Sequence, residues 1–160
     1  MQARAIGATL TVLALLTGSF RAGAEEGLAV SDAWVRLAPP SAPSHAGYLS
    51  LANSGPVTRS LVAVESPGYA KVELHQSRID GDVASMAPVD RIELAPGQVV
   101  HFAPGGLHLM LIGPKVPVAL GSTVELTLRL GDGTTVAARA VVKRDAAAAN
   151  PDHGSAPHRH

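Results

Sequence analysis

The stretch Gly105-Gly106-Leu107-His108-Leu109-Met110-Leu111-Ile112-Gly113-Pro114 sets an alternating apolar segment between two pairs of turn residues. Side chains alternate across a β-strand, so positions two apart share a face. The three leucines therefore take one face, which we expect to pack in a core, while His108 and Met110 point together to the other side. The alternation predicts a strand over residues 107–112 that carries an imidazole and a thioether on its non-core face.

Short apolar runs separated by turn residues continue along most of the chain. We expect further strands over residues 28–36, 47–53, 58–64, 70–75, 91–94, 99–102, 123–130 and 135–142. Pairs such as Pro67-Gly68, Asp80-Gly81 and Pro96-Gly97 mark the breaks between them. None of these segments shows sustained helical periodicity. Many short strands at near-regular spacing predict an all-β sandwich or barrel in a single domain.

The two ends of the chain differ from this pattern. Residues 1–24 combine an early arginine, a short apolar run and the small-x-small sequence Ala22-Gly23-Ala24, as a secretory signal peptide does. The apolar run is shorter than the roughly 20 residues that span a bilayer. Residues 145–160, rich in small residues and without an apolar pattern, predict a mobile extension. We expect a signal peptide at 1–24, a folded domain at 25–144, a flexible tail at 145–160 and a periplasmic location.

Composition excludes several classes of function. The chain has 13 basic and 13 acidic residues, few aromatic residues and no cysteine. It therefore offers no basic stripe or stacking platform, and we expect no nucleic-acid binding. Without cysteine it has no disulfide, no thiol to carry a lipid anchor and no thiolate for blue-copper electron transfer. No nucleophile–base motif is present, so we do not expect an enzyme.

Two histidines and two methionines follow the spacing H-x10-M-x21-H-x-M: His75, Met86, His108 and Met110. After Met1 the chain has no other methionine, so it does not use this residue as an adaptable filler of the core. Thioether sulfur is a soft donor that suits Cu(I), and imidazole ligates copper in either oxidation state. The four residues predict a copper site.

Turn geometry indicates how the first two of these residues meet. His75 falls on the face opposite the apolar stripe of its strand. A two-residue connection at Asp80-Gly81 would place His75 directly opposite Met86, with Cβ atoms about 4.5–5.5 Å apart. The segment between them is not strongly strand-like, and a looser loop is the alternative. In either case we expect this pair and the pair on residues 107–112 to converge on one ion at a surface, a rim or a second layer.

At these residues the chain resembles the periplasmic copper A chaperone family, PCu(A)C, whose members carry the same H-x10-M-x21-H-x-M pattern. The resemblance covers about residues 28–143, including the segments DAWVR (32–36), GYLSLAN (47–53), VELH (72–75) and PGGLHLM (104–110). It implies a cupredoxin-like Greek-key β-barrel that binds one Cu(I) per chain through His75, Met86, His108 and Met110. It also implies delivery of copper to the copper A subunit of cytochrome c oxidase or to an assembly factor. Gln76 stands where some members have a methionine, which removes a backup donor.

The other histidines are open to more than one interpretation. His153, His158 and His160 either form an additional Cu(II) site in the tail or are solvated. His45 and His101 have no partner that the sequence reveals, and we interpret them as structural or surface groups. Two other functions stay open for the domain, which we expect to be monomeric: copper or zinc buffering in resistance, and a metal-free β-sandwich interaction module.

Overall fold

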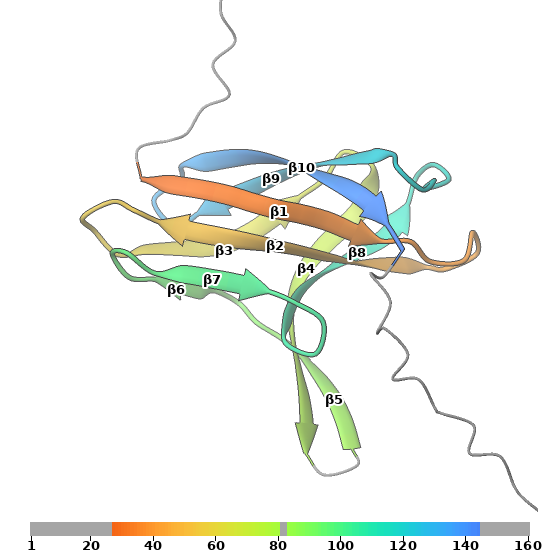
Figure 1. Cartoon of the computed structure of the whole chain (residues 1–160), viewed down its shortest axis with the longest axis horizontal. Helices are drawn as coiled ribbons and strands as arrows, with labels where there is room; N and C mark the ends of the chain where they lie inside the picture. The colour runs from red at the N-terminus through yellow and green to blue at the C-terminus, as the bar shows by residue number, and fades with distance from the viewer. Residues whose placement is uncertain (1–26, 81–82, 145–160) are drawn as a thin grey trace, which may run out of the picture.

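The computed structural model describes residues 27–80 and 83–144, and ten β-strands make up the regular secondary structure of these residues (Figure 1). The strands are β1 (Leu28–Arg36), β2 (Ser44–Asn53), β3 (Arg59–Glu65), β4 (Tyr69–Asp80), β5 (Val83–Pro88), β6 (Ile92–Leu94), β7 (Val99–Phe102), β8 (Leu107–Pro114), β9 (Thr123–Leu130) and β10 (Thr135–Lys143).

The all-β prediction is confirmed. Within the described residues there is no helix, and so none that could cross a membrane. The predicted signal peptide (1–24) and tail (145–160) lie outside the residues that the structure describes.

The strands form one sheet in the order β5-β4-β8-β2-β1-β10-β9-β3-β6, with β7 added to β2. Every pairing is antiparallel except that of β1 with β10. The first half of β2 pairs with β8 and the second half with β7. The sheet curls until β3 and β4 touch, and it forms a barrel from which the β4–β5 hairpin projects (Figure 1).

The core of the barrel consists of apolar side chains that alternate along the strands, from Leu28 on β1 to Val142 on β10. Leu109 and Leu111 are fully buried, and Leu107 packs against the same cluster, so the core face predicted for residues 107–112 is confirmed. Each such leucine stabilises the fold by about 1.5–3 kcal/mol through burial. Opposite them, Gly47 of β2 leaves no room for a side chain, because a Cβ atom there would lie 2.8 Å from Leu111 Cδ1.

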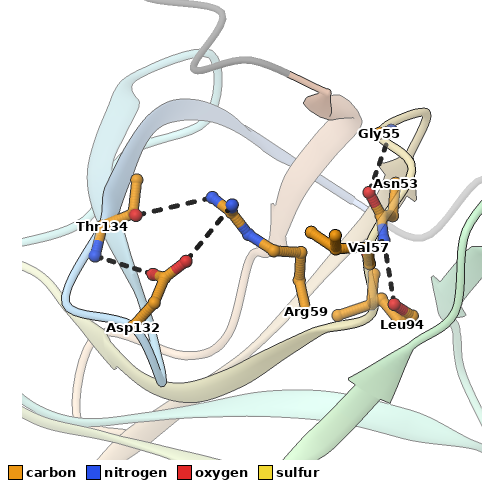
Figure 2. A network of polar contacts seen from close by, with 7 residues as sticks. All are labelled: Asn53, Gly55, Val57, Arg59, Leu94, Asp132 and Thr134. Carbon is orange, nitrogen blue, oxygen red and sulfur yellow. Dashed lines mark hydrogen bonds and ion pairs between the residues drawn. The ribbon is translucent and has the colours of Figure 1, made fainter.

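Asn53, at the end of β2, is a buried polar residue that joins the β2–β3 loop to the end of β6 (Figure 2). Its side chain is 2% exposed. Its Nδ2 donates to the carbonyl oxygens of Val57 at 2.8 Å and Leu94 at 2.9 Å, and its Oδ1 accepts from Gly55 N at 3.1 Å. Asn53 thus satisfies backbone groups that would otherwise be buried without partners.

A second polar contact in Figure 2 joins the start of β3 to the β9–β10 turn. Arg59 pairs with Asp132 at 3.2 Å, and Asp132 accepts a hydrogen bond from Thr134 N at 2.9 Å. These bonds hold the pKa of Asp132 below its usual range, with the bonds to Thr134 as the main cause. The carboxylate therefore stays ionised and keeps the turn closed against Arg59.

The hairpin after His75 forms, but its predicted register is wrong. Ser77 lies opposite Met86, and His75 lies opposite Pro88. The base of the hairpin sets this register, because Val89 N donates to Leu74 O at 2.8 Å. The shift is two residues, an even number, so His75 and Met86 still share a face as diagonal neighbours.

Candidate metal centre

The non-core face of β4 and β8 brings the two histidines together. His75 lies directly opposite His108 in the antiparallel pair. Their ring centroids are 5.8 Å apart, and the ring planes make an angle of 57°. His108 is 5% exposed and the His75 side chain 14% exposed, so both rings are largely out of water. Met86, by contrast, is exposed, so this face is covered at the two histidines and reaches solvent at the hairpin.

One ring nitrogen of His75 is held and the other has no bond. Nε2 lies 2.9 Å from Glu73 Oε2, and Nδ1 is buried without a hydrogen-bond partner among the described residues. An ionised carboxylate only accepts, so Nε2 carries the proton and Nδ1 carries the lone pair. A buried nitrogen lone pair without a hydrogen-bond donor destabilises the fold, and a metal ion bound to this nitrogen would satisfy it.

His108 is held through its other nitrogen. Its Nδ1 lies 3.1 Å from the carbonyl oxygen of Gly106, which only accepts, so this nitrogen donates. The lone pair of the neutral ring is then on Nε2. Metal-ligating histidines in proteins commonly donate their second nitrogen to a carboxylate or a backbone carbonyl in this way. Both imidazoles therefore fit a metal ligand.

The two methionines come from different parts of the same region. Met110 of β8 is half-buried between Glu73 on β4 and Ala46 on β2. Met86 of the projecting β5 is 53% exposed. Three of the four predicted ligands, Met86, His108 and Met110, line one cleft of about 200 Å³. His75 lies beside this cleft as the cross-strand neighbour of His108.

An aromatic and basic wall borders the cleft. Tyr48 of β2 and Arg36 of β1 both line it, and the Arg36 guanidinium lies 5.6 Å from the centre of the Tyr48 ring. Trp34, the cross-strand neighbour of Tyr48 on β1, packs against it, with 4.5 Å between the two ring centroids. The sequence analysis did not identify this wall, because it depends on the pairing of β1 with β2.

Glu73 is the second group that the sequence analysis missed. It accepts hydrogen bonds from both Lys71 and His75, and these bonds hold its pKa below the usual range, the bond from Lys71 being the larger cause. The pattern Lys71-x-Glu73-x-His75 places all three side chains on one strand face. That alternation was a usable signal, since a carboxylate two positions from a histidine can reach its ring.

The remaining histidines have other surroundings. His45 is buried and bonded to the Tyr69 hydroxyl at 3.2 Å, and burial lowers its pKa. His101 is exposed and bonded to Ser50 Oγ at 2.9 Å. Both therefore are structural or surface groups, as interpreted from the sequence. The tail histidines lie outside the described residues, and within the described ranges no three His, Asp or Glu side chains gather where they could hold an ion.

Comparison with known proteins gives consistent matches over the whole barrel. Residues 28–142 match the family described as "Putative lipoprotein LpqE-like". A protein of Leifsonia xyli subsp. xyli named "Putative lipoprotein Lxx21020" is 31% identical over 129 residues, which are 80% of this chain and 76% of that protein.

Two solved structures share the fold. The apo PCuAC domain of PmoF2 is 26% identical with a TM-score of 0.62, over 76% of this chain and 93% of that domain. The Cu(I) form of DR1885 from Deinococcus radiodurans is 30% identical with a TM-score of 0.60, over 78% of this chain and 85% of that one.

Proposed function

Because the chain belongs to the LpqE-like family and is similar to a solved PCuAC domain, as its sequence predicted, we propose that it is an exported copper chaperone. It binds one Cu(I) through His75, Met86, His108 and Met110 and passes the ion to another protein. The observation that carries this proposal is the pair of facing imidazoles, each anchored through one nitrogen and presenting a lone pair on the other.

The donor set favours Cu(I) over harder ions. Zinc, calcium and magnesium sites draw mainly on thiolate, imidazole or oxygen ligands, whereas thioethers suit Cu(I). Two thioethers and two imidazoles are all neutral, so they do not cancel the positive charge of the ion. Met86, which lines the same cleft as His108, is 53% exposed, so an ion can reach this residue from solvent.

The same donor set favours release to a thiolate. A cysteine thiolate would cancel the charge of Cu(I) and hold it more tightly than a thioether does, so a cysteine-bearing acceptor wins by ligand exchange. Cu(I) has a filled d shell and no ligand-field preference, and its ligands can be replaced one at a time. Met86 is the most exposed of the four residues and stands on the projecting hairpin, so we propose that it leaves first.

The acceptor that the family resemblance implies is the copper A subunit of cytochrome c oxidase or one of its assembly factors. An exported chaperone would meet such a subunit outside the cytoplasm. The solved relative DR1885 is described in its Cu(I) form, which supports the oxidation state of the cargo. A binding and transfer role of this kind needs no enzymatic step.

Transfer of copper between two purified proteins tests the proposal. The full mature chain is loaded with Cu(I), mixed with an apo copper A domain, and followed through the purple absorption of the assembled centre. We expect one Cu(I) per chain and growth of the purple band. The control is Met86→Leu with Met110→Leu, which keeps side-chain volume and removes both sulfur atoms. Tight Cu(I) binding without transfer would indicate a buffer, and no stoichiometric binding would refute the copper site.

A further inference from the structure

We propose that Glu73 is a positioning residue that fixes the ring of His75 so that Nδ1 is presented to the metal. This proposal rests on the proposed copper site and assigns a role to a residue outside the four ligands. It also assigns different ligating atoms to the two histidines: Nδ1 for His75 and Nε2 for His108.

The geometry of β4 brings Glu73 and His75 into contact. The two residues are two positions apart on β4, so their side chains lie on the same face. The Nε2–Oε2 distance is 2.9 Å, a normal length for this hydrogen bond. The other ring nitrogen is buried and has no partner in the described part of the chain. The carboxylate therefore selects one tautomer and leaves one nitrogen for the ion.

Lys71 holds the other end of the carboxylate. Its Nζ contacts Glu73 Oε1 at 2.5 Å while His75 contacts Oε2, so each oxygen has its own partner. A carboxylate held at both oxygens cannot rotate away from the imidazole without losing one bond. Lys71 is itself exposed, and we assign to it only the orientation of Glu73.

The arrangement has a direct consequence for affinity. With the wrong tautomer an N–H group, which cannot ligate, would face the metal. In characterised metal sites, loss of a residue that holds a ligating histidine lowers affinity by about 10–100-fold.

The test compares Glu73→Ala with a matched control, Glu65→Ala. Glu65 is also a strand glutamate paired with a basic side chain, Arg129, and it has no histidine partner in the described structure. Two quantities are measured on the full mature chain. The first is the His75 and His108 tautomer in the apo protein, by nitrogen-15 NMR of the rings near pH 8, above the usual histidine pKa of about 6.5. The second is Cu(I) affinity, by competition with a chelator.

We expect Glu73→Ala to convert His75 from a single tautomer to a mixture, leave the His108 tautomer unchanged and weaken Cu(I) binding by about 10–100-fold. Glu65→Ala should change none of these. In a His75→Ala background, Glu73→Ala should have no further effect on affinity, because the ring it positions is absent. Matching thermal melts of the variants would show that the barrel is intact.

An unchanged His75 tautomer in Glu73→Ala, or wild-type copper affinity, would overturn the proposal. Failure of the copper site is distinguishable from failure of this inference. If the wild-type chain binds no Cu(I), the proposed function is wrong, and the tautomer of the apo protein still decides whether Glu73 fixes the ring.

Discussion

Replacement of Asn53 by alanine removes a buried side chain that makes three well-formed hydrogen bonds, to Val57 O, Leu94 O and Gly55 N. Each bond contributes about 1 kcal/mol net, and a buried carbonyl left without a donor costs about 1–2 kcal/mol more. The expected loss in unfolding free energy is therefore about 3–5 kcal/mol. For a domain of this size that loss corresponds to a fall in Tm of about 10–20 °C.

Urea unfolding of the apo protein measures this loss, with the fluorescence of Trp34, the only tryptophan, as the signal. The matched control is Ser54→Ala, which removes one exposed hydrogen bond to Gly27 O at 3.2 Å and should cost less than about 1 kcal/mol. Asn53 lies about 23 Å along β2 from Ala46 at the cleft, so the folded variant should keep its Cu(I) affinity. A loss in unfolding free energy below about 1.5 kcal/mol, or one equal to that of Ser54→Ala, would refute the contribution assigned to the three Asn53 hydrogen bonds.

Four further predictions concern the site and the core. The Met86→Leu, Met110→Leu double variant should melt close to wild type and lose most of its Cu(I) affinity in chelator competition; equal affinity would exclude the thioethers as ligands. Cu(I) affinity should fall between about pH 8 and about pH 5, because a protonated imidazole cannot ligate, and a flat profile would count against both histidines. Burial lowers the pKa of His45, so the unfolded chain takes up its proton first, and the free energy of unfolding should drop as pH falls below about 6.5. His45→Gln should remove that part of the pH dependence, which denaturant titrations at several pH values measure. If the free energy of unfolding of the variant falls with pH as steeply as that of the wild type, this prediction is wrong. Gly47→Ala should cost about 1–3 kcal/mol, because the new Cβ lies 2.8 Å from Leu111 Cδ1, and calorimetry of the variant measures it.

Local patterns predicted much of the strand content. The bounds expected for residues 28–36 and 123–130 are those of β1 and β9, since alternation within each strand and turn residues beside it act over short distances. The strand faces of His75 and His108 were also predicted, because alternation alone sets them. What alternation does not predict is how deeply a side chain is covered, and His108 is more buried than a surface position would be.

Local patterns in the sequence do not predict which strands pair with each other or in which register they pair. The sequence Asp80-Gly81-Asp82 offers two favoured two-residue connections, Asp-Gly and Gly-Asp. The structure pairs Asp80 with Val83 because the bond from Val89 N to Leu74 O acts at the other end of the hairpin. The wall that Arg36 and Tyr48 form along the cleft likewise depends on which strands become neighbours.

The parallel pairing of β1 with β10 joins the first strand of the barrel to the last. Contacts between segments so far apart in the chain form late and make folding slow. Until Thr135–Lys143 has been synthesised and released, β1 and β9 each keep an open edge that can recruit strands from other chains. A chain truncated before β10 should therefore aggregate rather than fold.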